Sequence, residues 1–411
     1  MSKPHDLVIM GATGFTGRLV VEYLLGRYGT DGELDWAIAG RSEDKLNALC
    51  DELGAEGLPV IQADSHDRAS LDQLVEKTHV VCSTVGPYAL YGDELVAACV
   101  DAGTDYCDLT GEVPWMRRML DQHAEKAKQT GARIVHCCGF DSVPSDMGVR
   151  YAQAEAKNRF GGPLTQIRLG VEAMRGKMSG GTAASMMNII QESQKDPSVA
   201  RVLKNPYALC PEGMQSGVKQ PYVKGPQFDP SLNAWLAPFV MAAINTRVVH
   251  KSHALRDRAW GEDFIYDEAM MTGRGFKGRR AAWVWSLMLG GFALGAAVKP
   301  LRALMKKTVL PDQGEGPSRE QQQRGFYKLR LTGQSRDGRT LSVRVTGDRD
   351  PGYGSTAKML GEAAVCLATQ TPQSAVAGGF WTPSTALGQA FHERLVTNAG
   401  LTFEVIEPSA P

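Results

Sequence analysis

Hydrophobic residues in the first 150 positions alternate between short continuous runs and longer segments with helical spacing. The continuous runs are typical of strands buried on both faces, and the longer segments are typical of helices. The predicted strands are 6–12, 35–40, 60–64, 80–85, 104–110 and 132–139, and the predicted helices include 14–28, 42–53, 92–102 and 113–130. This alternation predicts an α/β fold, a doubly wound parallel sheet of the Rossmann type.

Beyond about residue 155 the regular alternation ends. The predicted elements there are a strand at 165–174, a helix at 181–194, two strands around Asp337-Gly338 within 326–348, helices at 355–368 and 387–398, and a strand at 401–406. Residues 205–235 are rich in Pro, Gly and Gln, which predicts a long irregular segment. A β-hairpin combined with helices predicts a second, α+β domain.

The composition of the 411-residue chain narrows the function classes. Lysine plus arginine equals aspartate plus glutamate at 45 each, so we predict no nucleic-acid partner. The eight cysteines include no C-x-x-C pair and no histidine pair has metal-ligand spacing, which predicts no metal site. The N-terminus lacks the pattern of a signal peptide, and the cysteine usage fits a reducing compartment, so we predict a cytoplasmic protein.

The segment GATGFTG, residues 11–17, joins the first predicted strand to the first predicted helix. The first glycine permits a tight turn, the second lets the backbone approach a pyrophosphate, and the third lets the helix pack closely on the strand. The free N–H groups at the start of the helix then face the phosphates. Because the segment opens a βαβ series, we interpret it as a cofactor site rather than an unliganded glycine-rich turn. The predicted cofactor contacts are Gly11, Thr13, Gly14, Phe15, Thr16 and Gly17.

The end of the second predicted strand, AGRS, indicates which dinucleotide binds. An NAD site places an acidic residue here for the ribose 2′-hydroxyl, whereas an arginine suits the 2′-phosphate of NADP. Arg41 follows the strand in place of an acid, and Ser42 adds a hydroxyl at the start of a helix. We therefore predict NADP(H), the alternative for Arg41 being a solvated side chain at a helix start.

Two further strand ends are predicted to line the cofactor. Asp64 ends the third strand, where it either contacts the adenine side of the cofactor or forms an ordinary turn. Val85, Gly86 and Pro87 follow the fourth strand and are predicted to lie beside the central part of the cofactor.

Several segments together are similar to a known family. They are GATGFTG (11–17), AGRS (39–42), TVGPYALYG (84–92), ACVDAGTDYCDLTGE (98–112), CCGFDSVPSD (137–146), EGPSREQQQRGFY (315–327) and TPSTALG (382–388). This set resembles the saccharopine dehydrogenase-like oxidoreductases, in the branch that contains the trans-acting enoyl reductases. The resemblance extends over nearly the whole chain, and it is specific for the family rather than for a substrate.

The resemblance implies a division of the chain into three parts. Residues 1–150 form an NADP(H)-binding Rossmann domain, 151–354 an α+β domain for substrate binding or oligomerisation, and 355–411 helices and a strand that return to the first domain. It also implies NADPH as the hydride donor. The substrate is then an α,β-unsaturated acyl chain on a carrier, as for the enoyl reductases, or an amino-acid imine, as for the saccharopine reductases.

Reduction of an enoyl compound places a hydride on one carbon and leaves an enolate that needs a proton. Proton donors are expected at the carboxyl ends of the strands, where doubly wound sheets bind ligands. Our catalytic candidates are Tyr88, Asp141 and Ser142. Each has a structural alternative: Tyr88 packs against a cofactor ring, and the other two form a helix start before Val143-Pro144.

An uncharged apolar run covers residues 281–298. Basic residues flank it on both sides: Lys277, Arg279 and Arg280 before it, and Lys299, Arg302, Lys306 and Lys307 after it. Three interpretations stay open: a buried core helix, an apolar surface that contacts lipid or a long acyl substrate, and a membrane span. The second interpretation predicts a peripheral membrane contact.

The leading functional interpretation is an NADPH-dependent oxidoreductase for an unsaturated, lipid-like acyl substrate, either a small molecule or one bound to an acyl carrier. One alternative is a saccharopine-type imine reductase. The other is a membrane-associated protein that binds NADP(H) without turning it over. A homodimer formed through the second domain is also left open by the sequence.

Overall fold

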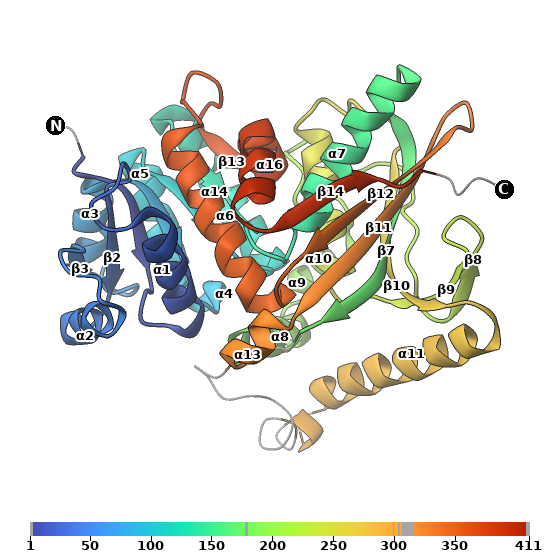
Figure 1. Ribbon diagram of the computed structural model, residues 1–411, viewed down its shortest axis with the longest axis horizontal. Helices are drawn as coiled ribbons and strands as arrows, with labels where there is room; N and C mark the ends of the chain where they lie inside the picture. The colour runs from blue at the N-terminus through green and yellow to red at the C-terminus, as the bar shows by residue number, and fades with distance from the viewer. Residues whose placement is uncertain (1–2, 177–179, 299, 303–304, 306–315, 408–411) are drawn as a thin grey trace.

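The computed structural model describes residues 3–176, 180–298, 300–302, 305 and 316–407 (Figure 1). Within these residues two sheets form, each of seven strands. The first sheet is built mainly from the N-terminal third of the chain, and the second from residues beyond 160. This arrangement confirms the α/β fold with a doubly wound sheet and a second part that mixes helices with a largely antiparallel sheet.

The first sheet has the strand order β13-β6-β5-β4-β1-β2-β3, and all of its pairs are parallel. Its strands are β1 (His5–Met10), β2 (Trp36–Gly40), β3 (Val60–Gln62), β4 (Thr78–Ser83), β5 (Asp105–Asp108), β6 (Arg133–Val135) and β13 (Gly379–Trp381). The order reverses between β1 and β4, and in such sheets ligands bind at the carboxyl ends of the strands beside this reversal.

Helices cover both faces of the first sheet. They are α1 (Phe15–Tyr28), α2 (Glu43–Leu53) and α14 (Thr356–Thr369) on one face, and α3 (Arg68–Glu76), α5 (Asp93–Ala102) and α6 (Val113–Thr130) on the other, with the short α4 (Tyr88–Tyr91) after β4. Successive β1 residues show the reason: Leu7 and Ile9 enter the core beside α1, whereas Val8 and Met10 enter the core beside α5. Burial on both faces explains the continuous apolar runs.

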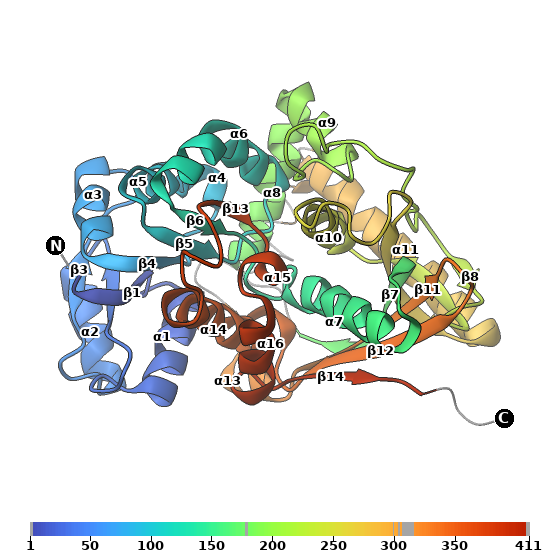
Figure 2. The same ribbon diagram turned by 90° about the horizontal axis from the view of Figure 1, so that it is seen from above.

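The C-terminal part of the chain completes the first sheet. β13 pairs with β6 at the end of the sheet that faces the second half (Figure 2), and α14 packs against α1, β1 and β4. The carboxylate of Glu362 on α14 is fully buried, where it accepts hydrogen bonds from the hydroxyls of Tyr23 at 2.5 Å and Tyr28 at 2.6 Å and pairs with Arg394 at 2.8 Å. Residues from both ends of the sequence therefore share one core.

The second sheet has the order β14-β12-β11-β7-β10-β9-β8. Its strands are β7 (Leu164–Arg175), β8 (Gln227–Asp229), β9 (Ala234–Pro238), β10 (Ile265–Gly273), β11 (Phe326–Ser335), β12 (Thr340–Gly347) and β14 (Leu401–Val405). Only the pair of β7 with β10 is parallel among these described strands. The predicted hairpin is confirmed, with Gly338 at a φ of 88° in its turn.

The remaining helices are α7 (Val143–Phe160), α8 (Gly180–Lys195), α9 (Pro197–Lys204), α10 (Ala242–Ala254), α11 (Gly275–Ala297), α13 (Arg319–Gln323), α15 (Pro383–Ala386), α16 (Gly388–Thr397) and a π-helical turn, η1 (Pro351–Ser355). Four of them, α7, α10, α11 and α16, pack on strands of the second sheet. The prediction of irregular structure over 205–235 is wrong at its end, because β8 and the start of β9 lie there. Pairing of β9 with β10 overrides the local composition.

Candidate functional site

The glycine turn after β1 brings α1 against the strands. Gly11 has a φ of 87°, and a Cβ atom there would lie 2.6 Å from Cγ2 of Val85, so only glycine fits. A Cβ atom at Gly17 would overlap the carbonyl oxygen of Gly11. The Thr84 hydroxyl fixes the turn by donating to the carbonyls of Met10 at 3.1 Å and Gly11 at 3.2 Å.

The start of α1 is open to an anion. Its N-cap residue is Gly14, no side chain caps the helix, and no acidic residue occupies its first turn. Thr13 and Gly14 are exposed, and Thr16 is half-buried. Unpaired N–H groups and the positive end of the helix dipole therefore face outward at this turn, which is how phosphates are bound at helix starts.

Arg41 lies at the end of β2 with its side chain exposed. Among the described residues its guanidinium has no hydrogen-bond or ion-pair partner, while its backbone carbonyl accepts a bond from Nε2 of Gln62 at 3.0 Å. The Ser42 hydroxyl caps α2 by accepting a bond from the Lys45 N–H at 3.4 Å. The guanidinium is thus free to bind a 2′-phosphate, and Ser42 holds the helix beside it.

Asp64 takes part in a turn: its carboxylate accepts a bond from the N–H of His66 at 3.0 Å, and its own N–H donates to the hydroxyl of Ser70 at 3.0 Å. This geometry favours the turn interpretation of Asp64 and leaves its adenine contact a prediction.

The loop after β4, which contains Val85, Gly86 and Pro87, is anchored by one carboxylate. Glu112 accepts hydrogen bonds from the backbone N–H groups of Tyr88 at 2.8 Å and Ala89 at 3.0 Å. It also accepts one from the hydroxyl of Ser185 on α8, at 2.7 Å. Burial raises the pKa of Glu112 above its usual value. The loop beside the glycine turn is therefore tied to a helix of the second half of the chain.

The hydroxyl groups of Tyr88 and Ser142 both form hydrogen bonds within the protein. The buried Tyr88 hydroxyl donates to the carbonyl of Ser83 at 3.0 Å, and burial raises its pKa far above the usual value. The fully buried Ser142 hydroxyl donates to Oδ1 of Asn245 at 3.2 Å, and Asn245 in turn donates to Glu268 at 2.8 Å. These geometries point to structural roles for Tyr88 and Ser142, so our catalytic proposal rests on Asp141.

Asp141 lies in the loop between β6 and α7 and is half-buried. Its carboxylate faces the loop after β5, where a Cβ atom built on Gly111 would lie 3.2 Å from Oδ1. Burial, together with the charge of nearby Asp108, raises the pKa of Asp141 to about 7. At neutral pH this carboxyl group therefore carries a proton in a sizeable fraction of molecules, as a general acid requires.

Comparisons with known proteins show the family and the fold. Residues 7–135 match the model of the saccharopine dehydrogenase NADP binding domain. A Mycobacterium tuberculosis protein provisionally named a trans-acting enoyl reductase is 40% identical over 409 residues, and the trans-acting enoyl reductase of Mycobacterium ulcerans is 36% identical over 406, each alignment covering 96% of both chains. Apo saccharopine dehydrogenase (L-Glu forming) from Saccharomyces cerevisiae shares the fold, with a TM-score of 0.53, 13% identity and coverage of 98% and 100%.

The chain belongs to the saccharopine dehydrogenase-like family. It is an NADP-dependent oxidoreductase of the branch that contains the trans-acting enoyl reductases. Its residues fit the cofactor: the glycine cradle leaves no room for a Cβ, α1 starts without a capping side chain, and the Arg41 guanidinium has no partner among the described residues.

Phe15, the first residue of α1, contacts residues from the second half of the chain. Its ring meets that of Tyr353 edge-on at 5.1 Å, and Gly316 packs directly on it. A cavity of about 500 Å³ lies beside this contact, lined by Phe15, Arg18, Leu19, Glu22, Gly316, Pro317, Ser318, Arg319 and Gln322. The sequence pattern contains no signal for these contacts, nor for the bond from Ser185 to Glu112, because each joins residues far apart in the chain.

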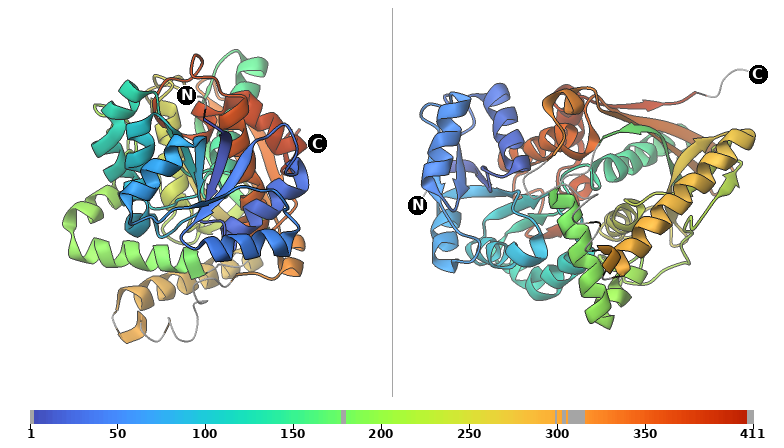
Figure 3. Two further views of the ribbon diagram at one scale, coloured as in Figure 1. Left: turned by 90° about the vertical axis from the view of Figure 1, so that its left-hand side faces the viewer. Right: turned by 90° about the horizontal axis from the view of Figure 1, so that it is seen from below.

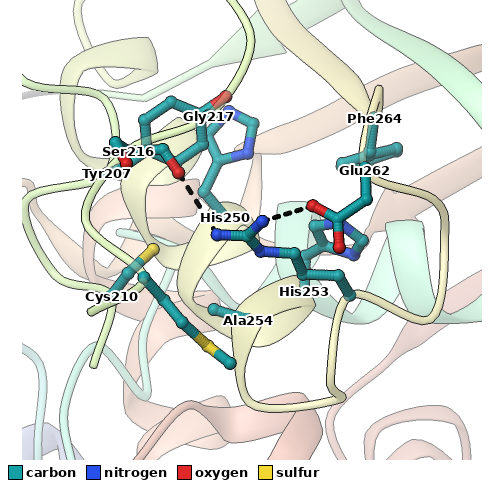
Figure 4. A pocket seen from close by; sticks show the side chains of 11 residues that line it. Tyr207, Cys210, Ser216, Gly217, His250, His253, Ala254, Glu262 and Phe264 are labelled. Carbon is teal, nitrogen blue, oxygen red and sulfur yellow. Dashed lines mark hydrogen bonds and ion pairs between the residues drawn. The ribbon is translucent and has the colours of Figure 1, made fainter. Parts of the chain in front are cut away.

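A second, smaller cavity of about 20 Å³ lies beside α10 (Figure 4), and no residue of the glycine turn lines it. Neither ring nitrogen of His250 has a hydrogen-bond partner among the described residues, and burial lowers its pKa to about 3. Burial also lowers the pKa of His253 to about 4. The volume suits about one water molecule and no substrate. The described residues contain no group of three or more His, Cys, Asp or Glu placed to hold a metal ion.

Proposed function

We propose that the protein reduces the carbon–carbon double bond of an α,β-unsaturated acyl thioester that is carried on an acyl carrier and has a lipid-like chain. The relatives that match over 96% of their length are named trans-acting enoyl reductases. The observation on which the proposal rests is the half-buried carboxyl group of Asp141, whose pKa is raised to about 7. A group that is protonated near neutral pH suits the proton that an enolate needs.

The residues of the site divide into two roles in this proposal. Gly11, Gly14, Gly17 and the start of α1 hold the pyrophosphate, and Arg41 holds the 2′-phosphate. When bound, NADPH supplies the hydride that adds to the β-carbon of the substrate. Asp141 gives its proton to the α-carbon and is protonated again from water, so the saturated thioester and NADP⁺ result. Val85, Gly86 and Pro87 keep their predicted place beside the cofactor.

The acyl chain has a candidate surface on α8. This helix carries half-buried apolar side chains at Met186, Ile189 and Ile190. It reaches the site through Ser185, which donates to Glu112 at 2.7 Å. Methionine and isoleucine on one helix give an adaptable apolar surface, which supports a chain of variable shape as the substrate.

The test measures loss of NADPH absorbance with a medium-chain trans-2-enoyl thioester, and in parallel with an amino acid mixed with an aldehyde as an imine source. We expect oxidation with the thioester, and a loss of kcat of about 10²–10⁴-fold in Asp141→Asn with NADPH affinity retained. Asp31→Asn, at an exposed position between α1 and β2, is the matched control. Oxidation with the imine alone would establish the saccharopine-type alternative instead.

A further inference from the structure

Helix α11 presents an apolar surface to solvent. Phe276 is 73% exposed, Leu287 is 68% exposed and Met288 is 64% exposed. Further exposed apolar residues on the same helix and just beyond it are Trp283, Val284, Leu294, Val298 and Leu301. Figures 1 and 3 show α11, drawn in gold, along an outer surface of the molecule. Exposed apolar patches of this kind mark surfaces that bind a partner or a membrane.

The opposite side of α11 is firmly docked on the second sheet. Gly278 and Ala282 are buried there, and the Thr272 hydroxyl on β10 donates to the carbonyl of Gly278 at 2.9 Å. The indole N–H of Trp285 donates to the carbonyl of Pro238 on β9, also at 2.9 Å. Because these contacts hold the helix in place, its outward face is a fixed feature of the fold.

The charges around α11 identify what this face binds. Every charged residue between Glu268 and Asp312 is basic: Arg274, Lys277, Arg279, Arg280, Lys299, Arg302, Lys306 and Lys307. Of these, Lys299, Lys306 and Lys307 lie outside the described residues and Arg302 is buried, so the exposed charges that the structure describes are Arg274, Lys277, Arg279 and Arg280, all at the start of α11. Because α11 contains no acidic residue, two copies packed face to face would bring no opposite charges together in either orientation. An anionic lipid surface instead matches both the apolar face and the charges.

We propose that α11 binds the surface of an anionic membrane, with its axis in the plane of the interface. None of the described helices is long and apolar enough to cross a bilayer. Phe276, Leu287 and Met288 would enter the acyl region, while Lys277 and Arg280 contact the phosphate groups. This inference goes beyond the proposed reaction and does not depend on it.

The experiment is co-sedimentation of the full chain with vesicles of phosphatidylglycerol mixed with phosphatidylcholine, against vesicles of phosphatidylcholine alone. We expect binding to the anionic vesicles that weakens as salt is raised. Leu287→Glu should lower the partition coefficient about tenfold or more, and Lys277→Gln combined with Arg280→Gln should lower it by a similar factor. Val396→Glu, at an exposed apolar residue on α16, is the matched control and should bind as the wild type does.

Three outcomes would overturn the proposal. The first is wild-type protein that stays in the supernatant with anionic vesicles at low salt. The second is equal binding by wild type and Leu287→Glu when circular dichroism and NADPH affinity show both to be folded. The third is a lipid-free dimer that Leu287→Glu dissociates, which would make the face a contact between copies. NADPH oxidation is not the readout, so failure here is distinct from failure of the proposed reaction.

Discussion

The two seven-stranded sheets bury their strands differently, and this difference separates the proposed catalytic loops from the proposed membrane-binding face of α11. Every residue of β2 in the first sheet is buried, whereas β11 in the second alternates between buried and more exposed positions. The parallel sheet is covered on both faces, so the ligand contacts that we propose are in the loops at the carboxyl ends of its strands. The second sheet instead supports α11, whose apolar face points away from the molecule. We therefore assign catalysis to the loops at the carboxyl ends of the first sheet, called the loop edge below, and membrane binding to the outward face of α11.

The largest expected effect tests the loop edge. In Gly17→Ala the new methyl group would overlap the carbonyl of Gly11, so α1 must move away from the proposed phosphate site. We expect NADPH affinity to fall about a hundredfold or more and the free energy of unfolding to fall by about 1–3 kcal/mol. Fluorescence titration and urea denaturation measure the two quantities.

Gly26→Ala on the same helix is the control for Gly17→Ala. No atom lies within 4 Å of a Cβ built at Gly26, so alanine should raise the free energy of unfolding by about 0.5–1 kcal/mol. NADPH affinity should stay unchanged. Equal NADPH affinity in both variants would show that the close approach of α1 to the turn is not what binds the cofactor.

The next effect concerns the choice of cofactor. Arg41→Ala removes a guanidinium that has no partner among the described residues, so the fold should be unaffected. We expect NADPH to bind about tenfold to a hundredfold more weakly and NADH to bind as before, because only NADPH carries the 2′-phosphate. Fluorescence titration with both nucleotides measures this. An equal loss for both would place Arg41 elsewhere on the nucleotide.

The same contrast explains what the sequence could predict. The first sheet is built from consecutive strands and helices, so local periodicity and the spacing of Gly11, Gly14 and Gly17 are enough to predict its elements and the turn. The position of β13 beside β6 depends on contacts that span more than 240 positions, and periodicity carries no trace of them. Periodicity likewise cannot predict that the Tyr88 hydroxyl forms hydrogen bonds with the backbone of β4 and of the loop after β5, because these partners belong to other elements of the fold.

For α11, the apolar run predicts a helix, but periodicity cannot say which side is covered. The interpretation as a buried core helix is wrong, because Phe276, Leu287 and Met288 are mostly exposed. The membrane span is also overturned for the described residues. Burial of one side only is decided by packing on β9 and β10, which lies outside any local pattern.

A smaller effect is expected in the pH dependence of the reaction. The proposed donor works only when protonated, and the pKa of Asp141 is raised to about 7. The rate kcat should therefore be constant below pH 7 and fall toward tenfold per pH unit above it. Asp141→Asn should lose this limb of the profile together with most of its activity. A wild-type rate that is flat from pH 6 to 9, about two units above the pKa, would assign the proton to another group.

The smallest effect concerns the second half of the molecule, where His250 and His253 stay neutral in the fold. Their pKa values are lowered to about 3 and about 4, so between pH 6.5 and these values the unfolded chain binds more protons than the folded one. The stability that these neutral histidines contribute is full above about pH 6.5 and is lost as the pH falls, by roughly 1–2 kcal/mol per histidine at pH 5.

Asp141 and Glu268, whose pKa values are raised to about 7, act in the opposite direction. The difference between wild type and His250→Phe in urea denaturation at pH 7 and pH 5 therefore isolates the histidine, because both proteins share the carboxyl groups. We expect the variant to lose less stability on acidification, and an equal loss would mean that His250 accepts a proton within the fold.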